Sequence, residues 1–111
     1  MAGYSGQEFA ARWHQLSLAE QMGNIGSEFD RVISWRKKNN AEFAEKAFDR
    51  TLELMDLTIA DPRWRGSGLK ELTRTREIVC DALVGDNTYN SSSESLSRYF
   101  LQFAIAARRT R

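Results

Sequence analysis

Four capping motifs, each at the start of a helix-period apolar pattern, constrain the fold of this chain most. In each motif a small polar residue is followed three positions later by glutamate. The four pairs are Ser5/Glu8, Ser17/Glu20, Asn39/Glu42 and Ser91/Glu94. The first side chain of such a motif accepts a hydrogen bond from a free N–H at the helix start, and the glutamate bonds the N–H of the capping residue. Together with a further helix start near Gly68, they predict an all-helical chain.

Apolar residues at three- and four-residue spacing give the extent of each predicted helix. The predicted ranges are 5–16, 17–38, 40–60, 69–84 and 92–108. The third helix ends at Asp61-Pro62, because a residue before proline is displaced from the α region. Gly85 is suited to the left-handed residue that follows the fourth helix. The basic residues 36–38 lie at the C-terminal end of the second helix, where cations interact favourably with the helix dipole.

Short connections make consecutive helices antiparallel neighbours. We therefore predict an all-α fold, namely an antiparallel up-down four-helix bundle over residues 17–111, preceded by an N-terminal arm with a short helix over residues 1–16. The apolar stripes predict a core of Leu18, Met22, Ile25, Phe29, Phe43, Ala47, Leu54, Leu72, Val79, Leu83, Phe100 and Phe103.

Three residues interrupt these apolar stripes. Gly23 and Gly26 lie inside a helix, where each is less favourable than alanine by up to about 1 kcal/mol. Their position predicts close approach of a neighbouring backbone, with a kink or a ligand contact as the alternative. Arg76 lies within the stripe of the fourth helix and must be paired if buried. Glu28 and Glu53 are its predicted partners. The alternatives are that the arginine reaches past the edge of the stripe to solvent, or that it forms an anion site.

Length and composition predict a single cytoplasmic domain. The chain has 111 residues, enough for one core, and a formal net charge of +1, which gives no global attraction for nucleic acid or membranes. The lone cysteine, Cys80, cannot form an internal disulfide, as expected in a reducing cytosol. The sequence contains neither an apolar run of about 20 residues nor a secretion signal at its N-terminus.

The third and fifth helices carry more apolar surface than a monomeric bundle needs to bury. Large exposed apolar patches usually mark interfaces, so we predict self-association. The predicted interface comprises Phe48, Leu52, Ile59, Leu101 and Ile105. The alternative is that the N-terminal helix, with Phe9 and Trp13, covers this surplus.

Basic residues gather at the end of the bundle where the third and fifth helices finish and the fourth begins. This basic pole comprises Arg63, Trp64, Arg65, Lys70, Arg108, Arg109 and Arg111. Cations beside an exposed aromatic ring are what phosphate contact and base stacking require. The alternative is that these charges are solvated and only favour helix ends and solubility.

The residue types of common catalytic sites are sparse, so we predict that the protein is not an enzyme and has no metal or cofactor. His14 is the single histidine, which excludes a di-iron site of the kind that needs two. Cys80 lies on an apolar stripe with no histidine near it in sequence. Residues 66–68 are a flexible turn, not a glycine-rich phosphate loop.

The segment Asn24-Ile25-Gly26-Ser27-Glu28, followed by Arg31, resembles a motif of small bacterial four-helix-bundle proteins. These are encoded in ribosomal RNA intervening sequences, and the accessory variability proteins of diversity-generating retroelements are related to them. Their motif is Asn-Ile-Ala-Glu-Gly, so Gly26 replaces the alanine and Ser27-Glu28 replaces Glu-Gly. The resemblance implies a pentameric barrel with a basic surface that binds nucleic acid or a reverse transcriptase.

Two functions are compatible with these features. The first is a non-enzymatic, self-associating bundle whose basic pole contacts RNA, DNA or a nucleic-acid enzyme. The second is a protein-interaction or scaffold module that docks a partner through its apolar faces and binds no nucleic acid.

Overall fold

The computed structural model describes residues 6–109, and all regular structure among them is helical. The five helices are α1 (Gln7–Trp13), α2 (Leu18–Lys37), α3 (Ala41–Ile59), α4 (Ser67–Val84) and α5 (Ser93–Arg109). The prediction of an all-helical chain is confirmed, and the predicted helices lie close to the observed ones. None of the described helices is both long enough and apolar enough to cross a membrane.

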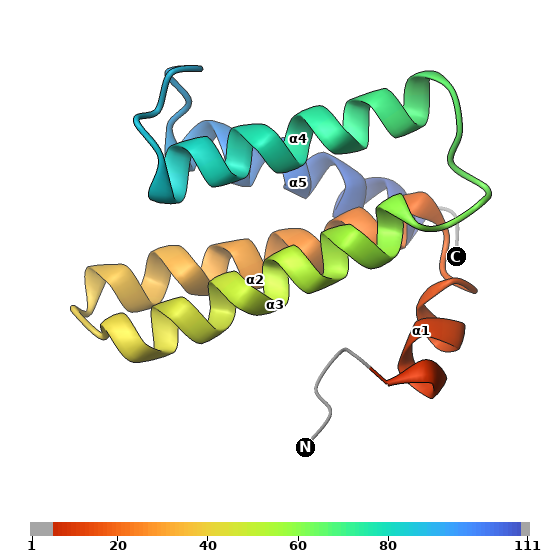
Figure 1. The fold of residues 1–111 in the computed structure, drawn as a ribbon, viewed down its shortest axis with the longest axis horizontal. Helices are drawn as coiled ribbons and strands as arrows, with labels where there is room; N and C mark the ends of the chain where they lie inside the picture. The colour runs from red at the N-terminus through yellow and green to blue at the C-terminus, as the bar shows by residue number, and fades with distance from the viewer. Residues whose placement is uncertain (1–5, 110–111) are drawn as a thin grey trace.

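Helix α2 is the central element, because both α3 and α5 pack along it. Figure 1 shows α2 and α3 side by side, joined at one end by a short turn at residues 38–40. Helix α4 packs against α3, and the Tyr99 hydroxyl of α5 donates a 2.6 Å hydrogen bond to the Glu71 carboxylate of α4. Helix α1 contacts α3 at the end far from that turn.

Of the three predicted capping boxes that lie within the described residues, the one at Ser17/Glu20 forms as predicted. At the start of α2, Ser17 Oγ accepts a hydrogen bond of 3.1 Å from Glu20 N, and the Glu20 carboxylate accepts one of 2.9 Å from Ser17 N. Helix α1 instead begins after Gly6, which has no side chain to cap it. Ser5 lies outside the described residues.

The other two caps are displaced by one residue, because the preceding turns use the predicted residues. Asn39 adopts a left-handed φ of 58° in the tight α2–α3 turn, so Asn40 caps α3 and accepts from Phe43 N at 3.1 Å. The backbone N–H of Ser91 donates to Asn87 Oδ1, and Ser92 Oγ accepts from Ser95 N at 3.0 Å instead.

Most of the predicted core is confirmed. The buried members are Met22, Ile25, Phe29, Ala47, Leu54, Leu72, Val79, Leu83 and Phe100. Leu18 and Phe103 are only partly buried. The prediction is wrong for Phe43, which is 42% exposed, because it lies in the first turn of α3 and contacts Trp35 edge-on at the surface.

Arg76 forms an ion pair, but with neither predicted partner. Its Nε lies 2.8 Å from Asp56 Oδ1 on α3. The arginine side chain is one-third exposed, so the guanidinium reaches past the edge of the α4 stripe to a surface carboxylate. Glu28 pairs instead with Arg31 on its own helix.

Gly23 and Gly26 allow α5 to approach α2 closely. A Cβ placed on Gly26 would lie 2.4 Å from Phe100 Cβ, which is closer than two carbon atoms can pack. A Cβ on Gly23 would lie 3.1 Å from the backbone Cα of Ala104. The predicted packing role of both glycines is therefore confirmed.

The first prediction tests this contact by replacing Gly26 with alanine. Gly26→Ala should lower the free energy of unfolding by about 1–3 kcal/mol through overpacking against Phe100, although alanine favours the helix. The matched control is Gly68→Ala in the first turn of α4, since no described atom lies within 4 Å of a Cβ there. That variant should be as stable as wild type or more so. Urea unfolding measures both, and a Gly26→Ala protein as stable as wild type would contradict the close packing.

Candidate nucleic-acid interface

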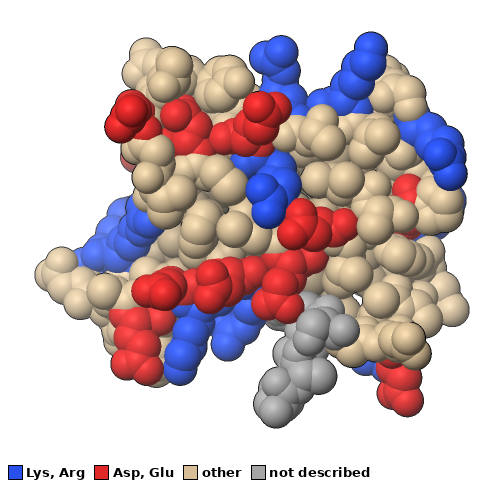
Figure 2. Space-filling view, viewed as in Figure 1, with Lys and Arg blue, Asp and Glu red and all other residues tan. Residues whose placement is uncertain are grey.

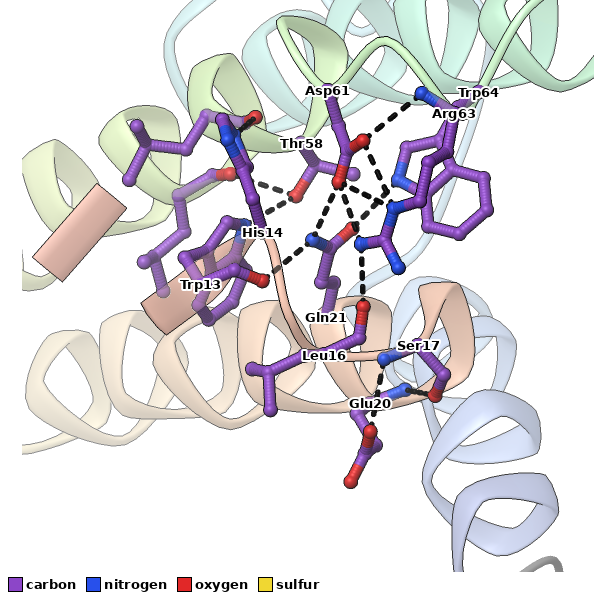
Figure 3. Close-up of polar contacts among 12 residues, drawn as sticks. Trp13, His14, Leu16, Ser17, Glu20, Gln21, Thr58, Asp61, Arg63 and Trp64 are labelled. Carbon is purple, nitrogen blue, oxygen red and sulfur yellow. Dashed lines mark hydrogen bonds and ion pairs between the residues drawn. The ribbon is translucent and has the colours of Figure 1, made fainter. Parts of the chain in front are cut away.

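The centre of the predicted basic pole is a polar network with a buried carboxylate (Figure 3). Asp61 follows α3 and is 2% exposed. Its carboxylate accepts hydrogen bonds from Arg63 Nη2 at 2.7 Å, from Arg63 Nε at 3.1 and 3.2 Å, and from Arg63 N at 3.0 Å. Arg63 Nη2 also donates to the Leu16 carbonyl at 2.6 Å. Arg63 therefore links the α3–α4 connection to the start of α2.

Gln21 of α2 is the buried amide that joins this network to Trp13 and Trp64. Its Nε2 donates to the Trp13 carbonyl at 2.9 Å and to the Asp61 carboxylate at 3.3 Å. Its Oε1 accepts from Trp64 Nε1 at 2.8 Å. Because the amide has both donors and its oxygen bonded, it is accommodated at 0% exposure.

Helix α1 is fastened to α3 beside this network. Trp13 Nε1 donates to Thr58 Oγ1 at 3.0 Å, and His14 Nε2 donates to the Leu57 carbonyl at 2.8 Å. The Thr58 hydroxyl in turn donates a hydrogen bond of 2.9 Å to the Leu54 carbonyl. The single histidine therefore has a structural contact that positions α1.

Two of the seven predicted pole residues thus have structural roles. The Arg63 guanidinium pairs with Asp61 and lies 4.4 Å from the centre of the Trp64 ring, which is itself partly buried. Four others, Arg65, Lys70, Arg108 and Arg109, are exposed. Arg111 lies outside the described residues. The pole therefore keeps exposed cations, but its aromatic ring is engaged in the fold.

Hydrogen bonds from Arg63 hold the pKa of Asp61 well below its usual range, helped by the Gln21 amide, whereas burial acts in the opposite direction. A carboxyl whose folded pKa is depressed stabilises the fold above its unfolded pKa of about 3.9. That stabilisation is lost as the pH falls toward the folded pKa.

The second prediction removes this charge with Asp61→Asn. Loss of the charged acceptor of Arg63, whose side chain is 41% exposed and can be solvated, should lower the free energy of unfolding at pH 7 by about 1–3 kcal/mol. Between pH ~4 and ~2 the variant should lose less stability than wild type, because it lacks the carboxylate whose protonation destabilises the fold. Asp86→Asn, at an exposed position, is the control. Urea unfolding across pH measures the effect, and parallel acid profiles for Asp61→Asn and wild type would contradict it.

A basic and aromatic groove lies on the seam between α2 and α3, away from the predicted pole. Its volume is about 420 Å³. The residues that line it are Arg31, Ser34, Trp35, Phe43, Lys46 and Arg50. We call this the α2–α3 groove. Its lining includes three cations and no carboxylate, beside two large aromatic rings.

The two aromatic rings of this groove form a pair that is flanked by cations. Trp35 and Phe43 meet edge-on with ring centres 4.9 Å apart. Lys38 Nζ lies 5.0 Å from the centre of the Trp35 ring, and Lys46 Nζ lies 5.5 Å from that of Phe43. Lys46 also forms an exposed ion pair of 3.4 Å with Glu42, a kind worth little in water.

The sequence patterns do not predict the α2–α3 groove. The helix dipole explains residues 36–38 and the apolar stripe explains Phe43, and neither pattern includes Trp35. The available signal was a tryptophan directly before three basic residues, followed across a two-asparagine turn by a phenylalanine.

Helix α3 carries acidic and basic side chains on adjoining faces. Figure 2 shows an acidic row along the position that α3 occupies in Figure 1. The acidic residues of α3 are Glu42, Glu45, Asp49, Glu53 and Asp56, at three- and four-residue spacing. Lys46 and Arg50 of the same helix line the α2–α3 groove instead. Anions are therefore attracted to the face of α3 that lines the groove and repelled from the acidic face beside it.

The five residues of the predicted self-association interface are divided between two helices. Phe48 and Ile59 of α3 are partly buried against the core, and Leu52 is half-buried. On α5, Leu101 is 49% exposed and Ile105 is 40% exposed. Residues 13 and 14 at the end of α1 hydrogen-bond α3 at Thr58 and Leu57, whereas Leu101 and Ile105 of α5 are exposed. Coverage of the surplus surface by α1 stays a prediction.

Within residues 6–109, no three histidine, cysteine, aspartate or glutamate side chains gather as a metal site would require. Comparison with family models, with curated proteins and with solved structures gives no match to this chain. The resemblance to the intervening-sequence proteins, drawn from residues 24–31, stays a prediction.

Proposed function

We propose that the protein is a non-enzymatic four-helix bundle, formed by α2 to α5 in up-down order, that binds nucleic acid through the α2–α3 groove. The observation that carries this proposal is the Trp35–Phe43 ring pair set among Arg31, Lys46 and Arg50. A nucleic-acid enzyme that presents its bound strand there is a compatible partner.

The chemistry of the groove matches the two parts of a nucleotide. Lysine and arginine contact the phosphates and release condensed counterions. Aromatic rings supply stacking of about 1–3 kcal/mol per base, with little regard to sequence. Phe43 is 42% exposed, so its ring is accessible without unfolding of α3.

The third prediction removes two groove cations with the double variant Lys46→Gln and Arg50→Gln. Fluorescence anisotropy with a labelled oligonucleotide should show binding at low salt that weakens steeply as salt rises. The variant should bind more weakly, and the slope of log K against log salt should become less steep by about 1.4, since each phosphate contact to a single strand contributes about −0.7.

The matched control is Arg65→Gln with Lys70→Gln, which removes two exposed cations from the basic pole. It should bind nearly as well as wild type. Equal weakening by the two pairs would show that binding follows overall charge and would overturn the groove as the site. Absence of binding at low salt would remove the proposal altogether.

A second candidate function is a self-associating protein-interaction module. The observation that favours it is the exposure of Leu101 and Ile105, four positions apart on α5. Two exposed apolar side chains at this spacing form one patch on a helix surface. An isologous dimer through this patch is the simplest assembly.

The fourth prediction tests this patch with Leu101→Glu and Ile105→Glu together. Light scattering should report an oligomer for wild type and a monomer for the variant, with unchanged helix content by circular dichroism. Gln102→Glu with Ala106→Glu adds the same charges one position further round α5 and is the control. A wild-type protein that is monomeric at high concentration would contradict self-association.

A further inference from the structure

A second groove lies between α1, α2 and α3, and it adjoins the α2–α3 groove. Its volume is about 500 Å³, and its lining includes Phe9, Arg12, Asn24 and Arg31. Arg31 lines both grooves, so the two meet at this side chain. We call the second one the α1 groove.

The α1 groove repeats the pairing of a cation with an aromatic ring. The Arg12 guanidinium lies 5.9 Å from the centre of the Phe9 ring, and Phe9 stacks on Trp13 with ring centres 6.0 Å apart. The exposed Asn24 amide adds a donor and an acceptor that could bond the edge of a base. Each groove therefore combines arginine with an aromatic side chain.

The charge of the joined grooves favours an anion. The lining cations are Arg12, Arg31, Lys46 and Arg50. The one lining carboxylate is that of Glu28, which is buried and ion-paired with Arg31 at 3.2 Å. A neighbouring phosphate would therefore meet an excess of positive charge along the whole seam.

Helix α1 is held in place before any ligand binds. Trp13 bonds Thr58 through its indole and Gln21 through its carbonyl, and His14 bonds Leu57. These contacts fix the α1 groove relative to α2 and α3. A ligand that spans both grooves would not have to order α1 as it binds.

We propose that a single-stranded nucleic acid lies along the α2–α3 seam and occupies both grooves, with bases on Phe9 at one end and on Trp35 and Phe43 at the other. This rests on the proposed function and adds to it α1 as a second contact site and single strands as the ligand class. A duplex hides its base faces in its own stack, whereas a single strand offers them to aromatic rings.

The length of the seam sets the minimum length of a strand that can occupy both grooves. Asn24 in the α1 groove and Trp35 in the α2–α3 groove are eleven positions apart on α2. Eleven helical residues span about 16 Å. A stacked strand advances about 3.4 Å per nucleotide, so about five nucleotides reach from one groove to the other.

The experiment measures the affinity of the full chain for labelled oligothymidylates of about three to about twelve nucleotides at low salt. The affinity of wild type should rise until about five nucleotides and then level off. Arg12→Gln, and separately Phe9→Ala, should weaken binding of the long strands about tenfold and leave the shortest strand unaffected. Arg12 is exposed, so its variant tests the site even if loss of the Phe9 ring destabilises α1.

The matched control is Arg74→Gln with Tyr89→Ala, which removes one exposed cation and one exposed aromatic ring outside both grooves. If Lys46→Gln with Arg50→Gln weakens binding but the α1 variants behave like this control, the two-groove proposal is wrong and the proposed function stands. If the variants of neither groove weaken binding, the proposed function and the two-groove proposal are both wrong. Equally tight binding of a duplex of the same length would overturn the single-stranded ligand.

Discussion

The buried carboxylate of Asp61 fixes the place where three segments of the chain meet. Arg63 bonds it from the α3–α4 connection, and Gln21 bonds it from α2. A carboxylate that is 2% exposed is tolerated only with partners of this kind. The partners in turn hold the carbonyls of Trp13 and Leu16, so the connection between α1 and α2 is set by the same charge. The α1 groove of the candidate interface depends on that placement.

Helix α2 positions α3 and α5, because each packs along a different side of it. Its glycine face is closed by α5, where Gly26 leaves no room for a methyl group beside Phe100. With α5 held against that face, the seam with α3 lies along another side of α2. Arg31 and Trp35, one turn apart, are presented on that seam. Close packing of α5 on one side of α2 thus helps to position Arg31 and Trp35, the groove residues on another side.

Local rules predicted the helices, because apolar period, proline and capping residues act within a few positions of each other. They failed where a turn competes for the capping residue, as at Asn39 and Ser91. Local rules cannot predict the contact between the Trp35 and Phe43 rings, because it joins two helices. Trp35 and Phe43 meet only because Asn39, at a φ of 58°, turns α3 back along α2. Asp61 marks the end of a helix in the sequence, but its burial also depends on a hydrogen bond from Gln21, forty positions earlier.

A net charge of +1 is compatible with anion binding because this chain separates its charges across single helices. Lys46 and Arg50 line the α2–α3 groove, whereas the acidic residues of α3 lie on the adjoining face of the same helix, where Glu42 is 3.4 Å from Lys46. Charges farther apart than the screening length of about 8 Å at physiological salt interact weakly. Repulsion from the more distant acidic residues is therefore partly screened at the groove, whereas a phosphate in direct contact with Arg50 is screened much less. The local cations, and not the net charge, then govern how a polyanion approaches.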